Sequence, residues 1–194
     1  MSELASYRLS DFILFTATAY YRQFELYNQA IWPLHIVAIV FALLIFYALW
    51  AKKVWSGRLI ALILVICWVW VAVAFLYQRF YQIHVVADWY ALGFVLQAGL
   101  ITWHGVIRNQ FTHFVRNQLG IIICSGLLFV AIIFYPFKTY ISGRSWIQFE
   151  MFALAPDPTV LATLAILFFC NASVVLYVIP IIWILISSMT LSVM

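Results

Sequence analysis

The sequence predicts an all-α protein, a polytopic bundle with about six transmembrane helices and an N-terminal helix at the membrane interface. Hydrophobic residues make up 68% of the 194 residues and charged residues only 8%, whereas soluble domains average about 45–50% and about 25%. Lipid offers no hydrogen-bond partners to the backbone, so the hydrophobic stretches are expected to be helices. At about 20 residues per crossing, five or six spans use up the chain.

Four hydrophobic stretches with uncharged cores, in the first three quarters of the chain, predict the first four spans. Each is about 20 residues long, which crosses about 30 Å of hydrocarbon at 1.5 Å per residue. A basic residue follows each stretch closely and marks its end. The predicted spans are Ala30–Trp50, Arg58–Tyr77, Ala87–Ile107 and Leu119–Phe137.

The C-terminal part of the chain is too long for one span. No charged residue follows Asp157 for 37 residues, which would make a helix of about 55 Å. Asparagine and serine favour turns, so we expect a break at "CNAS", residues 170–173. This leaves a short segment, 158–170, and a full span, 174–194, in which Pro180 should produce a kink.

The stretch "APDPT" predicts how the short segment begins. Asp157 suits the N-cap, and Pro158 suits the first helical position, where its missing N–H costs nothing. Pro156 should keep the preceding residue extended. Residues 151–155 then either dip into the membrane as a re-entrant stretch or extend the span with a break, and we expect the break.

The N-terminal stretch Leu9–Leu26 is expected to form the interfacial helix, with Ser10 or Asp11 as its cap. Acidic residues stand where a secretory signal would carry basic ones, so we expect the first hydrophobic segments to be retained. The chain is therefore expected to be one integral-membrane domain, with the interfacial helix in residues 1–27 and the transmembrane bundle in residues 28–194.

Several classes of function are not supported by the sequence. The ten basic residues are scattered, whereas a nucleic-acid interface concentrates them on one face. No cysteine spacing predicts a disulfide framework or a zinc site. Haem would need paired deep histidines, and only His35 is expected to be deep. No catalytic motif is present, so we expect no catalytic residues, no metal, no cofactor and no enzymatic activity.

A polar stripe is predicted where the first span begins. At 100° per residue its members fall within a sector of about 140°, although a break at Pro33 could rotate the lower part away. The stripe either lines a site between helices or is an interfacial helix start whose side chains reach water. Its members are Arg22, Glu25, Asn28, Gln29, Trp32 and His35.

A second polar pair precedes the third span. His84 and Asp88 are four residues apart, so one helix face would present both. An aspartate that orients an imidazole is typical of metal and acid–base sites, but also of an ordinary ion pair. On the expected topology all six acids of the chain lie on one side of the membrane, where a cation site is conceivable. The candidate polar site comprises Glu25, Asn28, His35, His84, Asp88 and Asp157.

Three stretches resemble a bacterial integral-membrane family of unknown function. "FELYNQAIWPLH" has its Tyr-Asn and Trp-Pro pattern, "DWYALGFVLQAGL" its Trp, Gly and Gln pattern, and "APDPT" its Pro-x-Pro-Thr motif, with Asp157 where many members carry another small residue, often cysteine. The resemblance covers nearly the whole chain after Thr16 and implies a shared multi-span helical fold without implying an activity. The residues that we assign to this structural motif are Trp32, Pro33, Gln97, Pro156, Pro158 and Thr159.

The densest basic cluster, "WAKKVWSGR", is expected in the cytoplasm by the positive-inside rule. With six spans both termini then face outward, in a bacterial inner membrane. The expected partners are the lipid bilayer and either other membrane subunits or further copies of the chain, and not nucleic acid.

The leading functional expectation is an accessory or scaffold subunit of a membrane complex. Small residues would let its helices approach one another or a partner closely: Ala87, Ala91, Gly93 and Gly99. The first alternative is a facilitative channel or carrier for a small solute or ion, lined by the broken helix after Asp157. The weaker alternative is a metal- or lipid-handling enzyme. No acidic or basic residue is expected in the centre of a span, where coupled pumps usually carry one.

Overall fold

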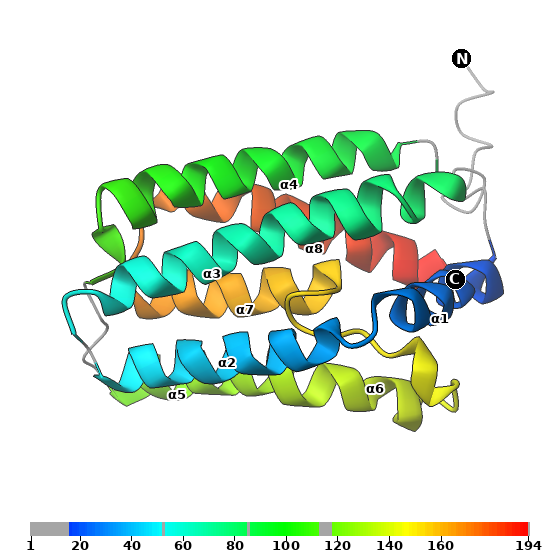
Figure 1. Ribbon diagram of the computed structural model, residues 1–194, viewed down its shortest axis with the longest axis horizontal. Coiled ribbons are helices and arrows are strands. Elements are labelled where there is room, and N and C mark those ends of the chain that lie inside the picture. The colour runs from blue at the N-terminus through cyan, green and yellow to red at the C-terminus, as the bar shows by residue number, and fades with distance from the viewer. Residues whose placement is uncertain (1–15, 52, 85, 113–117, 194) are drawn as a thin grey trace, which may run out of the picture.

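The computed structural model describes residues 16–51, 53–84, 86–112 and 118–193, which form a bundle of long helices (Figure 1). No strand occurs in this part of the chain. The α-helices are α1 (Ala17–Ile31), α2 (Leu34–Ala51), α3 (Ser56–Trp70), α4 (Ala87–Ile101), α5 (Gln118–Phe129), α6 (Tyr135–Ile141), α7 (Pro156–Phe169) and α8 (Val178–Val193). Three π-helical stretches continue the helices after α3, α4 and α5, namely Val71–Tyr77, Thr102–Ile107 and Val130–Phe134. Four short 3-10 helices cover Phe80–Gln82, Gln110–Thr112, Trp146–Gln148 and Val174–Tyr177.

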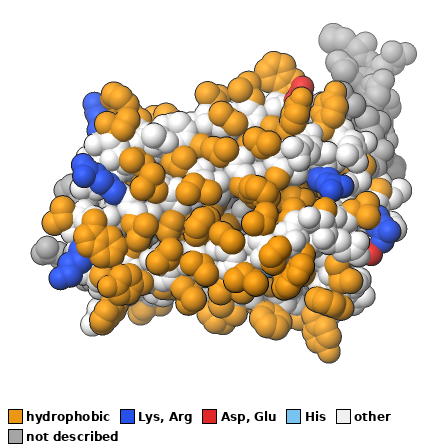
Figure 2. Space-filling view, in the orientation of Figure 1, with side chains coloured by type: hydrophobic (Ala, Val, Ile, Leu, Met, Phe, Trp, Pro, Cys, Tyr) orange, Lys and Arg blue, Asp and Glu red, His pale blue; other side chains and the backbone are white. Residues whose placement is uncertain are grey.

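Within the described ranges, five continuous helical segments are long and apolar enough to cross a membrane. They confirm the predicted all-α, multi-span class, and their limits lie within a few residues of the predicted ones at most ends. The five segments are Leu34–Ala51, Ser56–Gln82, Ala87–Ile107, Gln118–Ile141 and Val174–Ser192. The predicted count of six is not confirmed, because α7 has only 14 residues. On the face shown in Figure 2, hydrophobic side chains cover the middle, and Lys and Arg lie toward the two ends.

The N-terminal helix differs from the predicted one. It runs over Ala17–Ile31, and the Thr16 hydroxyl accepts a hydrogen bond from the Ala19 N–H at its start. Ser10 and Asp11, the predicted caps, lie outside the described residues. The aromatic side chains of Tyr20, Phe24 and Tyr27 are buried, so this face of α1 packs on the bundle. Figure 1 shows α1 at the end of the bundle where α8 also ends.

Helix α7 lies inside the bundle and begins part way along it (Figure 1). Eleven of its residues are buried. The predicted break before it is confirmed: residues 149–155 are not helical, and Ala155 is extended, with φ −116° and ψ 150°. The predicted cap is wrong, because Ala155 is the N-cap, Pro156 is the first helical residue and Asp157 is the second. Proline can hold the first position because no N–H is needed there.

The last span begins at Val174, as predicted. The break at residues 170–173 is confirmed as a turn, in which Asn171 has φ 46°. A 3-10 turn over Val174–Tyr177 follows, and α8 begins at Val178. Pro180 is therefore the third residue of α8, where its missing N–H breaks no helical hydrogen bond. The kink expected at Pro180 stays a prediction, since Pro180 lies just after the junction between the 3-10 turn and α8.

A close helix approach occurs at a glycine that the sequence analysis did not select. A Cβ on Gly93 or Gly99 would meet nothing within 4 Å, so neither glycine mediates a close contact within the described part of the chain. A Cβ on Gly105 would lie 2.5 Å from the Ala61 Cβ and 3.3 Å from the Phe111 ring. Gly105 therefore lets the stretch after α4 pack directly against α3.

The Gly105→Ala variant is expected to be destabilised by about 1–3 kcal/mol, because the added methyl group overfills this contact. Gly93→Ala is the matched control and should be neutral or gain up to about 1 kcal/mol from helix propensity. Thermal unfolding of both variants in detergent measures the difference. Equal midpoints for the two variants would contradict the close contact.

Candidate polar site

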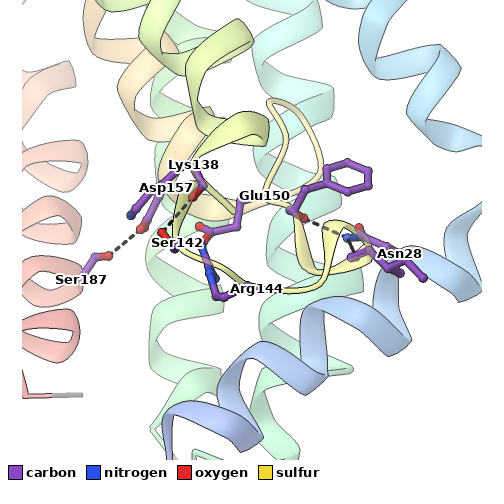
Figure 3. A network of polar contacts seen from close by, with 9 residues as sticks. Asn28, Lys138, Ser142, Arg144, Glu150, Asp157 and Ser187 are labelled. Atoms are coloured by element: carbon purple, nitrogen blue, oxygen red, sulfur yellow. Dashed lines mark hydrogen bonds and ion pairs between the residues drawn. The ribbon is translucent and has the colours of Figure 1, made fainter. Parts of the chain in front are cut away.

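The structure brings together charged side chains from both sides of the non-helical segment before α7 (Figure 3). Glu150 and Asp157 lie near two basic residues, Lys138 on α6 and Arg144 in the turn that follows it. Ser187 on α8 completes the group. We call Lys138, Arg144, Glu150, Asp157 and Ser187 the polar cluster.

Asp157 joins α7 to α8. Its side chain is buried, with the residue 8% exposed. Oδ1 accepts a hydrogen bond from the Trp183 indole N–H at 2.7 Å, and Oδ2 accepts one from the Ser187 hydroxyl at 2.8 Å. Its position in the first turn of α7 places it near the positive end of the helix dipole. These donors suit a carboxylate and fix its orientation.

Glu150 has a different environment. It is 4% exposed, and its carboxylate lies 3.9 Å from Arg144 Nη2, beyond hydrogen-bond distance. Burial, together with the nearby Asp157 carboxylate, raises the pKa of Glu150 to about 7, although Lys138 and Arg144 oppose the shift. Near neutral pH the Glu150 side chain therefore exchanges between its neutral and charged forms.

Arg144 is held by packing more than by hydrogen bonds. Its guanidinium lies 3.9 Å from the centre of the Tyr21 ring on α1, a favourable cation–π arrangement. Within the described residues, Nε and Nη1 are buried and have no hydrogen-bond partner. Buried donors without acceptors are costly. The free N–H groups of Arg144 can therefore donate to a carboxylate that comes closer, or to another acceptor.

Asp157 also lines a cavity of about 160 Å³ between α6, α7 and α8. Its polar lining consists of Asp157, Tyr135, Ser187 and Ser188. Its apolar lining consists of Leu161, Ile184 and Leu191. A second, smaller cavity of about 30 Å³ shares Ser187 and Leu191 and is lined mainly by aromatic residues. The larger cavity has room for several water molecules or a small solute.

The predicted stripe on α1 is only partly brought together. Asn28 Nδ2 donates to the backbone carbonyls of Ile147 and Phe149 at 2.7 and 2.9 Å, and its Oδ1 lies 3.3 Å from His35 Nε2. These contacts connect α1 and α2 to the turn before Glu150. Gln29 and Trp32 are exposed, whereas His35, beyond the turn at Pro33, is buried.

Glu25 binds the same turn from the outer side. It pairs with Arg22, and Gln148 Nε2 donates to its Oε2 at 3.3 Å. The hydrogen bonds from Arg22 and Gln148 lower the pKa of Glu25. Glu25, Asn28 and His35 thus support the segment that carries Glu150, and they do not line the cavity beside Asp157.

His84 and Asp88 have separate contacts. His84 Nε2 lies 3.4 Å from the Tyr90 hydroxyl, and burial lowers the pKa of His84. Asp88 is exposed, and its Oδ1 accepts a hydrogen bond from the Trp89 N–H. Among the described residues no three His, Cys, Asp or Glu side chains converge in a way that could hold a metal ion.

The residues assigned to the structural motif organise the entry to α7. The Thr159 hydroxyl accepts from the Ala153 N–H at 3.0 Å and donates to the Ala155 carbonyl at 2.6 Å. This closes the turn in which Ala153 has φ 72°. Pro156 and Pro158 occupy the first turn of α7.

The remaining motif residues have different surroundings. Gln97 is fully buried on α4, and its Nε2 donates to the Leu176 carbonyl at 2.8 Å. Trp32 is 67% exposed and precedes Pro33 between α1 and α2. Gln97 thus connects α4 to the start of the last span, whereas Trp32 faces outward.

Sequence reasoning missed most of the polar cluster. It placed Glu150 on the same side as the other acids but did not select it, and it did not select Lys138, Arg144 or Ser187. One signal was available: Glu150 and Asp157 are seven residues apart around the break before α7. Another was the four-residue spacing of Trp183 and Ser187, which puts both on one face of α8.

Residues 17–193 match a family of unknown function, DUF6064. Comparison with curated proteins and with solved structures found no match. The family match covers the same part of the chain as the resemblance predicted from the three stretches. The chain belongs to the DUF6064 family, whose function is unknown.

Proposed function

We propose that this protein is a facilitative carrier for a small solute, with Asp157 as its binding centre. The observation that supports this proposal is the buried Asp157 carboxylate at the start of an interrupted helix, lining a cavity of about 160 Å³. Transporters commonly form their binding sites at such interruptions, where a helix terminus and side chains converge. A buried ionisable group inside a membrane bundle is also costly, and is usually retained for function.

The position of the cavity fits a site reached from one side of the membrane. Tyr135 and Ser187 each lie about a turn and a half from the ends of their helical segments, Gln118–Ile141 and Val174–Ser192. Solute would therefore enter close to one membrane surface and contact Asp157, the Ser187 hydroxyl and apolar side chains of α8. The hydroxyls and the carboxylate would replace water around its polar groups.

Purified protein in liposomes tests this proposal by osmotic swelling with small neutral, cationic and anionic solutes. The wild-type protein should accelerate swelling for at least one class of solute. Asp157→Asn should reduce that rate about tenfold or more, since a charge-assisted hydrogen bond contributes about 1.5–3 kcal/mol.

Asp88→Asn is the matched control, because Asp88 is an exposed aspartate on α4. Liposomes that contain this variant should swell at the same rate as those that contain the wild-type protein. Absence of swelling with every solute, or an equal rate for Asp157→Asn and wild type, would overturn the carrier proposal. Thermal unfolding of both variants shows that a lost rate is not a lost fold.

We also propose an accessory-subunit role as the second candidate, and the burial of the last span supports it. Only 17% of that segment is buried inside the chain, compared with 56% of Ser56–Gln82. A span so weakly covered by its own chain leaves a wide face for lipid or a partner helix. Extraction in a mild detergent, followed by mass spectrometry, should then find a partner at constant stoichiometry. Recovery of the chain alone would contradict this role.

A further inference from the structure

The two buried carboxylates of the polar cluster have unequal surroundings. Asp157 receives two short hydrogen bonds, from Trp183 and Ser187. Within the described residues, the ion pair of Glu150 is with Arg144, at 3.9 Å. When two acids share a buried site, the one with better donors keeps the charge and the other takes the proton. The difference in environment, together with its burial, makes Glu150 the acid that takes the proton.

We propose that Glu150, buried 3.9 Å from an arginine with unpartnered donors, is a proton-binding site and that its charge controls the position of Arg144. When the proton leaves to water, the carboxylate gains a full negative charge beside a guanidinium that has unused donors. A charge-assisted hydrogen bond between them would be shorter than the observed separation. Release of the proton thus draws Arg144 toward Glu150.

Charged and titratable groups face Glu150 from three sides. Lys138 and Arg144, on α6 and the turn after it, favour its charged form, whereas Asp157 on α7 favours the neutral form. The hydroxyls of Tyr20 on α1 and Tyr135 at the start of α6 also lie within electrostatic reach of Glu150. Burial adds the largest preference for the neutral form, and the balance gives a pKa of about 7.

The coupling to Arg144 rests on its unpaired donors and on its contact with α1. Nε and Nη1 are buried without partners in the described part of the chain, and the guanidinium is stacked on Tyr21. Arg144 follows Gly143, which has φ 67°, in the tight turn after α6. A shift of Arg144 toward Glu150 would therefore weaken a contact between α1 and this turn. Loss of the proton would therefore change the packing of α1 against this end of the bundle.

Infrared spectroscopy of the full chain in detergent tests this inference without any flux measurement. The C=O stretching band of a protonated carboxylic acid should be present at pH 6 and disappear as the pH rises through about 7. Glutamate labelled with ¹³C in the side-chain carboxyl should shift this band, because the group that titrates is a glutamate. A band that shifts only with labelled aspartate would assign the proton to Asp157 and overturn the inference.

Two variants complete the test. Glu150→Gln should abolish the band, and Glu25→Gln is the matched control that should retain it, since the pKa of Glu25 is lowered. Arg144→Gln should move the transition upward by about one pH unit, a tenfold gain in proton affinity, because an opposing cation has been removed. A band that persists in Glu150→Gln, or no band in wild type near neutral pH, would refute proton binding at Glu150. An unmoved transition in Arg144→Gln would refute its link to Arg144. The carrier proposal is tested separately by swelling.

Discussion

The Trp68→Ala variant is expected to lose about 3–5 kcal/mol of stability, the range for removing a large buried aromatic side chain. Trp68 is fully buried on α3. Its indole N–H donates to the Thr163 hydroxyl on α7 at 2.9 Å, and its ring centre lies 4.3 Å from that of Phe94 on α4. Alanine would leave a cavity where three helices meet and would also leave Thr163 without its donor. Thermal unfolding in detergent measures the loss.

Trp89→Ala is the matched control for this variant. Trp89 lies near the start of α4 and is 68% exposed, so its removal creates no internal cavity. Its unfolding midpoint should stay close to that of wild type. If the unfolding midpoint fell equally in Trp68→Ala and Trp89→Ala, core packing of Trp68 would not be the cause of its loss of stability.

The Glu150→Gln variant is expected to be more stable than wild type above about pH 7. Burial and Asp157 raise the folded-state pKa of Glu150 to about 7 from an ordinary value of 4.5. The folded state therefore binds more protons than the unfolded state between these values, and wild-type stability falls as the pH rises through this window. The full shift corresponds to at most about 3 kcal/mol. Glutamine stays neutral, so the variant lacks this loss.

The two stability curves should converge below about pH 4.5, where Glu150 is protonated in both folded and unfolded states. Glu25→Gln is the control, and its effect on stability should be opposite in sign to that of Glu150→Gln. Hydrogen bonds from Arg22 and Gln148 lower the pKa of Glu25, so its contribution is present above about pH 4.5 and is lost as the pH falls through the folded-state value. Glu25→Gln should therefore be less stable than wild type at neutral pH. A Glu150→Gln curve parallel to wild type would contradict a buried titrating group.

The spans were predictable because lipid imposes a simple requirement of length and polarity. The third predicted span, Ala87–Ile107, agrees with the helical segment at both ends. The N-terminal helix was predicted less well, because a run of aromatic residues suits a membrane surface and a protein surface equally. Burial of Tyr20, Phe24 and Tyr27 depends on Phe75 and Phe80, which lie about 50 residues later in the chain.

The polar cluster was harder to predict because its members come from distant parts of the chain. Asp157 was selected from its neighbouring prolines, but its donors are on α8, 26 and 30 residues away. Arg144 and Lys138 were counted as span-end charges, and nothing in their local sequence indicates that they turn toward Glu150. Glycine spacing was similarly uninformative, since the close contact of Gly105 requires Ala61 and Phe111 from other segments.

The short helix α7 has a consequence for how the protein is made. Its 14 residues cannot cross the bilayer alone, and the polar groups at its start have partners on other helices: Trp183 and Ser187 bind Asp157, and the Tyr27 hydroxyl donates to the Leu154 carbonyl. An unpartnered carboxylate and open backbone are costly in lipid. Helix α7 is therefore expected to leave the insertion machinery only after α8 has been synthesised, so that the last two helices enter the membrane as one unit. In a chain truncated before Trp183, residues 156–169 should therefore remain accessible to protease, whereas the four preceding spans are protected.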